Sequence, residues 1–435
     1  MTTDQKETSG PGPRWRDRVP GGRDGRRMLL VTWVDKTGNG LWNTTSALYF
    51  IHVAGLSLVA VGTLVSVAAG IGVAGAPLAG RLADRFPVVR LLVAFQTVRA
   101  VAAVGLLLSD AYGALLFCAA LGSFGDRSAN VLTKLYAARL AGPHRVRYQA
   151  VIRTASNAGW AVGGLIAAGV LTLGTTHAYQ ALLIGDALSF AGAAALTLRC
   201  TEPPSPSRTV ARSGDAPGSR VSAGPVSPWR DRGYLAYVAT DTVVHLHDSV
   251  FQVGLALWTV HATKAPEGII PLLTVLNSGM VVALQVPLSR LGSGAAACRR
   301  LLPPVAGIFA GGGLALAASA VDGPWLAAAA LLLAAAVFSL GEILHAIVSW
   351  ELSVALAPAQ AQGAYVGVHG LAGSVQRSAG PLAVTAAIAA GPLGWAAFGA
   401  LMASACAAQH RLVRDRLPGP AAEPREAGSA SPTGV

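Results

Sequence analysis

Charged residues stand inside several long apolar stretches of this sequence, and their types suit the binding and release of protons. A charged side chain within a bilayer is costly and seldom faces lipid, so such residues usually line the interior of a helix bundle. A carboxylate there can exchange a proton when its surroundings change from wet to partly desolvated. The candidates for proton coupling are Asp35, Asp126, Arg127, Asp248 and Glu342.

Asp35 is the residue on which we base the coupling hypothesis. Its apolar stretch begins near residue 29, which places the carboxylate roughly 10 Å along a helix that rises about 1.5 Å per residue. Lys36 follows it directly and can pair with it. The alternative to a proton carrier is therefore a structural Asp35, bonded to a neighbouring helix or to Lys36. For Asp126 and Arg127 the alternative is a charge cluster that only holds helices together.

Polar residues also recur along single faces of the apolar stretches. Asp35, Asn39, Trp42 and Asn43 are spaced by three and four residues, as on one face of a helix. The stretch that contains Asp241 repeats this spacing. We predict that these faces line a substrate cavity, whose candidate residues are Asn39, Trp42, Asn43, Asn130, Arg153, Asn157, Trp160, Asp241, His245, Gln252, His345, His369, Gln376 and Arg377.

Aromatic and histidine side chains add two further possibilities. Trp42 and Trp160 could stack on an aromatic substrate, although tryptophan also anchors helices at the membrane interface. His245 and His247 fall on different helix faces, so with Asp248 they favour a proton relay over a shared ligand. No HxxxH-type pair and no CxxC pair occurs in the sequence. We therefore expect neither a metal site nor a cofactor.

Composition indicates which elements must position these residues. Of the 435 residues 53% are hydrophobic and only 12% are charged, and the mean hydropathy is +0.51. A soluble domain is about a quarter charged. This chain has too few charged residues to cover a water-exposed surface, so most of its surface must face the lipid bilayer. The net charge of +12 lies in short tracts between apolar runs. This distribution is typical of cytoplasmic loops rather than of a nucleic-acid-binding surface.

A membrane-spanning helix needs about 20 apolar residues, and twelve stretches meet that length. Backbone polar groups in lipid must be paired within the segment, so we predict an all-α protein. The stretches are 29–53, 56–79, 88–109, 111–136, 147–172, 177–198, 233–261, 266–290, 301–320, 324–352, 362–389 and 392–413.

Residues 199–232 interrupt the pattern with a segment rich in Pro, Ser, Gly and Arg, which is typical of a flexible linker. The expected domains are an N-terminal tail (1–28), a six-helix bundle (29–198), the linker, a second six-helix bundle (233–413) and a C-terminal tail (414–435). Basic residues cluster in the even-numbered loops, which predicts that both termini and the linker are cytoplasmic. High Arg, Ala and Gly contents suggest a bacterial inner membrane.

The segment after the second stretch carries a recognisable motif. It reads Gly80-Arg-Leu-Ala-Asp84-Arg85-Phe-Pro-Val-Val-Arg90 and resembles the loop signature of the major facilitator superfamily, roughly G-x-L-A-D-R-x-G-R-R/K. Pro87 and Val88 replace the usual Gly and basic residue. Independently of the family, a carboxylate at Asp84 can pair with nearby arginines or cap a helix N-terminus. The resemblance implies a gating loop formed by Gly80, Asp84, Arg85 and Arg90; the alternative is a basic loop that only fixes topology.

The resemblance also implies a fold and a mechanism. In this family two pseudo-symmetric six-helix bundles enclose a central cavity, lined chiefly by helices 1, 4, 7 and 10, and work by alternating access. Arg127 partly resembles a family arginine linked to proton transfer. The glycine-rich stretch from Asn157 to Gly164 resembles a motif of drug antiporters, although the proline that marks the motif is missing.

These observations predict a secondary transporter, not an enzyme, and no G-x-x-x-x-G-K-[ST] nucleotide site occurs. We expect proton-coupled efflux of a small amphipathic or weakly basic compound, such as a drug or secondary metabolite, by a monomer. The alternatives are a proton-coupled nutrient importer of the same fold and a membrane component without transport activity.

Overall fold

The computed structural model describes residues 19–208 and 227–417, and the described chain is helical without strands. Seven helices form the N-terminal half: α1 (Gly22–His52), α2 (Leu58–Gly72), α3 (Gly75–Arg85), α4 (Val88–Leu107), α5 (Tyr112–Ala141), α6 (Arg145–Leu171) and α7 (Thr176–Thr197). The C-terminal half contains α9 (Arg232–Val244), α10 (Leu255–Ala262), α11 (Ile269–Leu288), α12 (Ala295–Ala318), α13 (Pro324–Ala355), α14 (Gln362–Ala389) and α15 (Gly391–Arg416).

These helices make twelve spans because two spans are interrupted. The second span breaks between α2 and α3 at Val73 and Ala74. The seventh span breaks between α9 and α10, where a 3-10 turn (His245–His247) and a π-helical turn (Val250–Gly254) stand in the chain. Such turns release the regular helical hydrogen bonding and often mark functional sites. The sequence predicted both segments but not their breaks.

Apolar length alone identifies only part of this architecture. Eight stretches of the described residues could cross a membrane by length and composition, and one of them, Tyr112–Leu171, contains both α5 and α6. The spans outside this set are α1, the α9–α10 segment and α14. Each of them carries several of the polar residues named above, so their lower hydropathy reflects a face turned toward the protein interior.

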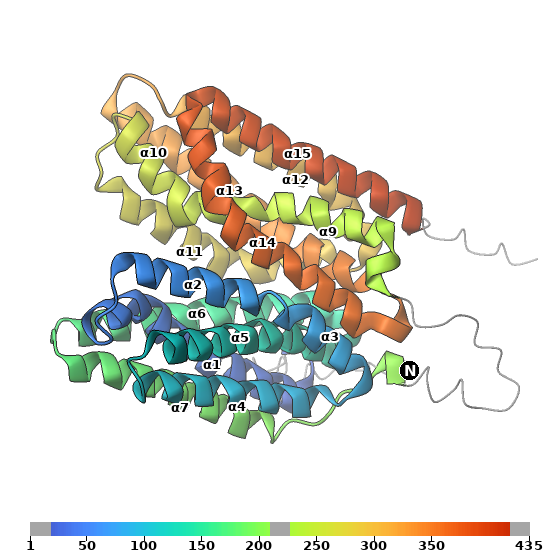
Figure 1. The fold of residues 1–435 in the computed structure, drawn as a ribbon. Helices are drawn as coiled ribbons and strands as arrows, with labels where there is room; N and C mark the ends of the chain where they lie inside the picture. The colour runs from blue at the N-terminus through green and yellow to red at the C-terminus, as the bar shows by residue number, and fades with distance from the viewer. Residues whose placement is uncertain (1–18, 209–226, 418–435) are drawn as a thin grey trace, which may run out of the picture.

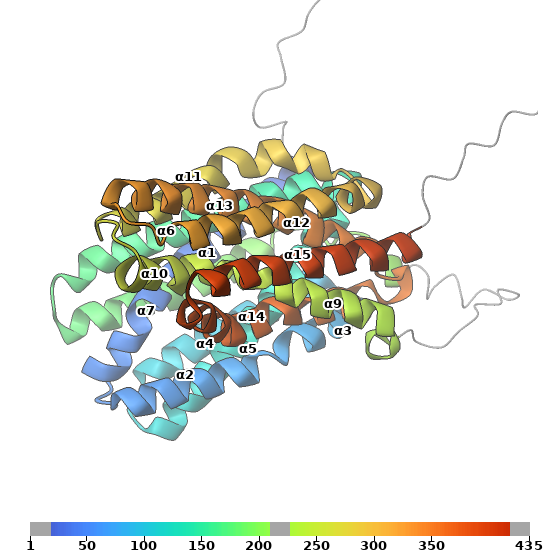
Figure 2. The ribbon, with the colours of Figure 1, turned by 90° about the horizontal axis from the view of Figure 1, so that it is seen from above.

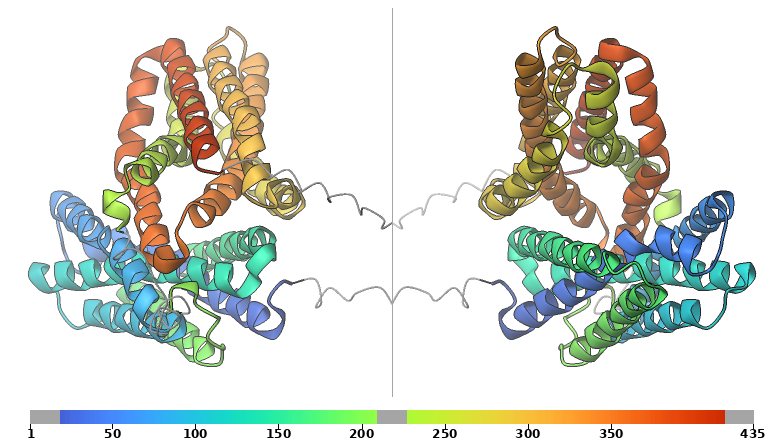
Figure 3. Two further views of the ribbon diagram at one scale, coloured as in Figure 1. Left: turned by 90° about the vertical axis from the view of Figure 1, so that its right-hand side faces the viewer. Right: turned by 90° about the vertical axis from the view of Figure 1, so that its left-hand side faces the viewer.

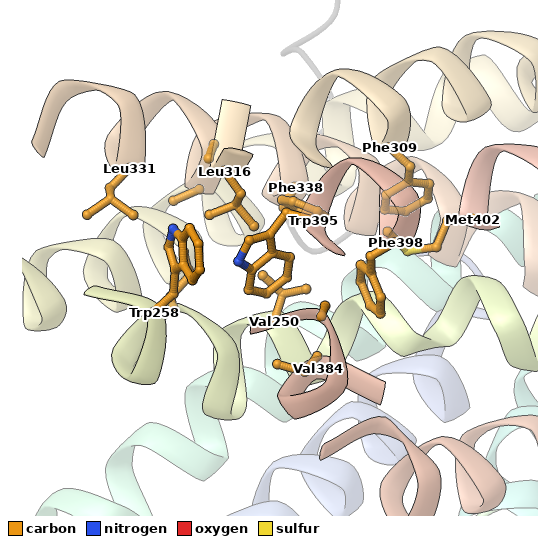
Figure 4. Packing of buried hydrophobic residues seen from close by; sticks show 14 of the residues in the cluster. Val250, Trp258, Phe309, Leu316, Leu331, Phe338, Val384, Trp395, Phe398 and Met402 are labelled. Atoms are coloured by element: carbon orange, nitrogen blue, oxygen red, sulfur yellow. The ribbon is translucent and has the colours of Figure 1, made fainter. Parts of the chain in front are cut away.

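The two halves are arranged as two lobes (Figure 1; Figure 3). The N-terminal half, blue to green, lies below the C-terminal half, yellow to red, and their helices run in broadly the same direction (Figure 2). Within the C-terminal half, Trp258, Trp395, Phe309 and Phe338 pack in one buried cluster (Figure 4). Most helix packing lies within a half, so each half has its own core.

One end of the molecule gathers most of the basic residues, and we call it the basic end. It comprises residues 19–27, 85–90, 139–147, 198–208, 227–232, 289–300, 355–364 and 414–417. We call the other end the open end; among its loops in the described chain, Lys264 is the one Lys or Arg residue. Helix α1 begins seven residues earlier than its predicted span and α15 continues to Arg416, so both predicted tails are partly helical.

The start of the predicted flexible linker packs against the N-terminal half. Glu202 accepts hydrogen bonds of 2.9 Å from the backbone N–H groups of Val88 and Val89, and so caps α4. Ser205 and Ser207 are buried. The linker expectation therefore does not describe residues 199–208, and residues 209–226 lie outside the described chain.

The basic end also ties the two ends of the C-terminal half together. Arg416 donates a hydrogen bond of 3.0 Å to Asp231, whose side chain caps α9 through the Tyr234 N–H. The Arg416 guanidinium holds the pKa of the Asp231 carboxyl below its usual value. This ion pair fixes the start of α9 against the end of α15.

Candidate functional site

A cavity of about 730 Å³ lies between the two halves. Helices α1, α2, α4, α5, α6 and α7 line it from the N-terminal side, and α11, α13, α14 and the turn after α9 line it from the other. Most pockets that hold small molecules measure about 300–1,000 Å³. The cavity is therefore large enough for a small organic substrate.

Asp84 bridges the two halves at the basic end. Its carboxylate accepts hydrogen bonds of 2.8 Å from the backbone N–H groups of both Gly363 and Ala364. These N–H groups belong to the first turn of α14, where the helix dipole favours a negative charge. Arg139 lies 3.7 Å from the same carboxylate. Asp84 thus caps a helix of the opposite half, while its ion-pair partner is Arg139 rather than one of the neighbouring loop arginines.

Small residues let α3 and α14 approach each other closely at this point. A Cβ atom added to Gly80 would lie 2.8 Å from the Gly367 Cα atom, and one added to Gly367 would lie 2.7 Å from the Ala76 carbonyl oxygen. Any side chain there would push the helices apart. Gly80 is therefore part of the contact between halves, whereas Arg85 and Arg90 are exposed at its rim.

Two ion pairs join α6 to α13 across the same interface. Arg145 makes a bidentate pair with Glu351, with distances of 2.7 Å from Nε and 2.6 Å from the terminal nitrogen. Deeper in the molecule, Arg153 pairs with Glu342, which also accepts a hydrogen bond of 2.9 Å from Asn277. No local spacing points to the Arg145–Glu351 pair, because its members are 206 positions apart. Together with Asp84, these pairs close the cavity toward the basic end.

Asp35 lies in a buried charge network of the N-terminal half. Its carboxylate pairs with Arg99 and accepts a hydrogen bond of 3.1 Å from Gln96. Lys36 lies 3.1 Å from the second carboxylate oxygen. The Arg99 side chain is only 2% exposed, so it is the main partner of the Asp35 charge. Arg99 was not among the predicted site residues, and a lone Arg within an apolar stretch was the one available signal.

Asp126 shares both cations with Asp35. It lies 3.4 Å from Arg99 and 4.0 Å from Lys36. Lys36 also donates a hydrogen bond of 2.9 Å to Asn130. Two carboxylates on α1 and α5 therefore hold one guanidinium and one ammonium group between them. Neutralising one carboxylate would leave both cations with a partner.

Asp186 completes this cluster from α7. The Arg99 guanidinium lies over the Phe190 ring at 3.8 Å from its centroid. One carboxyl oxygen of Asp186 is buried and has no hydrogen-bond partner among the described residues. Such a group is costly unless it finds a partner. Asp186 is the second residue of this network that the sequence did not predict.

Asp241 organises a second polar network inside the C-terminal half. Its fully buried carboxylate lies 3.0 Å from His345 Nε2 and 2.9 Å from His369 Nε2. Ser349 and Gln409 donate hydrogen bonds of 2.8 Å and 3.0 Å to it. These partners come from α13, α14 and α15, so one carboxylate connects four helices.

The histidines extend this network to the cavity. His247 Nε2 lies 3.1 Å from His345 Nδ1, and His247 Nδ1 lies 3.2 Å from Asp248. Asp248 and His245 both line the cavity. His245 and His247 are thus connected through Asp241 and His345, because His245 Nδ1 lies 3.3 Å from the Asp241 carboxylate and His345 Nε2 lies 3.0 Å from it.

Three of these residues also have the donor chemistry of a metal site. Ligand atoms of Asp241, His245 and His345 all lie within 4.8 Å of one another. Two imidazoles and one carboxylate suit divalent first-row metals. No metal site was expected because no HxxxH-type histidine pair occurs on one helix, whereas in the structure His345 comes from α13. In this structure His345 Nε2 and His245 Nδ1 lie 3.0 Å and 3.3 Å from the Asp241 carboxylate.

The structure brings most predicted cavity residues to one place, with three exceptions. Asp241 is buried behind the cavity wall, Gln376 is buried and bonded to Ser249, and Gln252 is exposed on the π-helical turn. The predicted residues that line the cavity are Asp35, Asn39, Trp42, Asn43, Asp126, Arg127, Asn130, Arg153, Asn157, Trp160, His245, Asp248, His345, His369 and Arg377.

Comparisons with known proteins agree on one fold. The model of the Major Facilitator Superfamily matches residues 28–381. No curated protein matches the chain.

Solved structures with the same fold are named for different transported compounds. A bacterial homologue of the iron transporter ferroportin, in an outward-facing state, has a TM-score of 0.64 at 14% identity, covering 90% of this chain and 98% of its own. The proton:xylose symporter XylE has a TM-score of 0.63 at 14% identity, covering 88% and 94%. The human organic anion transporter MFSD10 has a TM-score of 0.60 at 14% identity, covering 90% and 99%. At such low identity these likenesses concern the fold alone.

Proposed function

Because this chain belongs to the major facilitator superfamily, we propose that it carries a small amphipathic compound across the membrane by alternating access. The observation that carries the proposal is the one-sided closure of the cavity. The contacts of Asp84, Arg145 and Gly80 with the opposite half all lie toward the basic end. A transporter needs such a closure at one end at a time.

We place the basic end in the cytoplasm of a bacterium, because positively charged loops remain on that side. The structure then corresponds to an outward-facing state of a protein in the inner membrane, with both termini cytoplasmic. Each half has its own core, which suits two bodies that rock against one another in a monomer.

We further propose that protons drive the cycle and that Asp35 carries them. Asp35 and Asp126 share Arg99 and Lys36, so a proton on Asp35 would leave both cations to Asp126. That exchange changes the charge facing the cavity without stranding a buried cation, which would be costly. Glu342 and Asp248 are the competing carriers, since each also contacts a group at the cavity.

Transport into vesicles under an imposed pH gradient tests this proposal. With purified protein and a panel of amphipathic compounds, wild type should accumulate at least one compound, and the direction of the effective gradient separates efflux from import. Asp35→Asn should exchange that compound down its own gradient but lose accumulation. Asp322→Asn, at an exposed position of the open end, is the matched control and should behave as wild type.

Two results would count against the proposal. If Asp35→Asn keeps full gradient-driven accumulation while Asp248→Asn or Glu342→Gln loses it, another residue carries the proton. If no compound accumulates under any gradient, the chain is a membrane component without transport activity of its own.

A further inference from the structure

Three cations of the cavity wall stand without partners. Arg127 and Lys134 project from α5 and Arg377 projects from α14, and all three line the cavity. None of them makes a hydrogen bond or an ion pair with another described residue. The other cations of the wall are paired: Arg99 and Lys36 with carboxylates of the same half, and Arg153 with Glu342.

The three cations form one group that spans both halves. Arg127 and Lys134 are seven residues apart, so they lie on the same face of α5, about two turns from each other. Arg377 belongs to the opposite half and repels both of them. Lys134 and Arg377 are exposed to the cavity. Like charges therefore face each other from α5 and α14, beside the point where Val131 and Gly370 already bring the two helices into contact.

The carboxylates of the wall neutralise this group only in part, because Asp126 attracts Arg127 and Arg377 but forms no ion pair with either. Asp35 and Asp126 are held by Arg99 and Lys36. Asp186 is buried beside Arg99. Asp248 lies against His247. The wall contains six Lys or Arg residues and four Asp residues, which disfavours the weakly basic substrate expected from the sequence.

The same cavity offers an apolar surface next to the cations. Trp42, Phe50 and Trp160 line it together with Leu64 and Val65 of α2. Trp160 is 40% exposed, so its ring is accessible to a bound molecule. An amphipathic ligand could place an apolar body on these residues and a charged group on the cations.

We propose that the substrate is an amphipathic acid whose carboxylate, sulfonate or phosphate bridges Arg127, Lys134 and Arg377. This inference rests on the proposed transport function and gives its substrate class. The anion removes the repulsion between α5 and α14. It therefore binds more tightly to a cavity that is closed at both ends than to one that is still open at the open end. A ligand shifts a conformational equilibrium only through such a difference in affinity. Binding of the acid thus favours the closure of the cavity at the open end, which is the step that leads to its transport.

Calorimetric titration of the purified protein with a matched ligand series tests the inference. The series is 4-phenylbutyrate, 4-phenylbutanamide and 4-phenylbutylammonium, which share one apolar body and differ in charge. A hydrogen bond to a charged group contributes about 1.5–3 kcal/mol, so the acid should bind at least about tenfold more tightly than the amide. Raised salt should weaken binding of the acid and not of the amide.

Substitutions then locate the anion. Arg377→Gln should weaken the acid about tenfold or more and leave the amide unchanged, while Arg377→Lys should retain most of the affinity. Lys264→Gln, at the open end and outside the cavity, is the matched control. The inference is overturned if the amide or the ammonium compound binds as well as the acid, or if the acid does not bind. Binding is measured without a gradient, so a failure of proton coupling would leave this result intact.

Discussion

The Asp84 carboxylate and the Gly363 N–H group, 279 positions apart, share a hydrogen bond of 2.8 Å across the two halves of the protein. With the parallel bond to Ala364, it places a negative charge at the first turn of α14. A charge at this position contributes up to about 1 kcal/mol through the helix dipole, and a hydrogen bond to a charged group contributes more. This contact is therefore a latch for the closed basic end.

Asp84→Asn should weaken the latch while the protein still folds. The amide keeps one acceptor oxygen but loses the charge. We therefore expect the state with the basic end closed to lose about 1–2 kcal/mol of stability relative to the state with that end open, which is roughly five- to thirtyfold in the equilibrium constant between them. Transport should fall at matched expression. A cysteine at Val146, which is buried between the halves, should react faster with a thiol reagent. If Asp84→Asn transports and is labelled like wild type, the loop that contains Asp84 only fixes the topology of the chain.

The close approach of α3 and α14 gives a second prediction with a matched control on one helix. Gly367→Ala places a methyl group 2.7 Å from the Ala76 carbonyl oxygen, whereas Gly373→Ala meets nothing within 4 Å. We expect Gly367→Ala to increase labelling at Val146 and to slow transport. Gly373→Ala should change neither, and equal effects of the two substitutions would contradict the packing argument.

The Arg145–Glu351 pair predicts a specific non-additivity. Glu351 is only 2% exposed, so removing Arg145 leaves a buried charge uncompensated and should cost several kcal/mol of the closed state, whereas Arg145 is 28% exposed and removing Glu351 should cost less. The double variant Arg145→Met/Glu351→Met removes both charges and should be less disturbed than the sum of the single changes. Labelling rates at Val146 measure all three variants. Additive effects would show that the pair is not an energetic contact.

The orientation of the chain predicts which cysteines are accessible from which side. A cysteine at Ser213, within the predicted linker, should react only with reagent on the cytoplasmic side. A cysteine at Asp322, whose side chain is 92% exposed at the open end, should react from outside intact cells. The reverse pattern would invert the topology and the direction assigned to the cavity.

The sequence predicted the residues that share a local pattern and missed those joined only by tertiary structure. The stripe from Asp35 to Asn43 lies on one helix, and its spacing alone indicated that it faces a cavity. Asp84 was predicted because it belongs to a contiguous motif. Arg99 was not predicted, because its partners lie on α1 and α5 and no spacing along α4 points to them.

The interruption of the seventh span was invisible for a different reason. The stretch from Asp241 to Gln252 fits regular helical spacing, so a straight helix was expected. In the structure the Asp241 carboxylate binds His345 and His369 from other helices, and the chain between His245 and Gly254 departs from the α-helix. Tertiary contacts of a buried charge outweigh local propensity there.

Alternating access is the central claim, and distances measured by spin labels at both ends of the molecule test it most directly. One pair at Phe86 and Gln360 reports on the basic end, and a second pair at Leu58 and Leu272 reports on the open end; all four positions are exposed. Wild type should show a short distance at the basic end and a long one at the open end. With Glu351→Gln, a second, longer distance should appear at the basic end and a second, shorter distance at the open end. The fraction of molecules that show the new distance should be the same at both ends. If both distances lengthen together, or if the open end does not respond, the two ends are not coupled and the alternating-access account is contradicted.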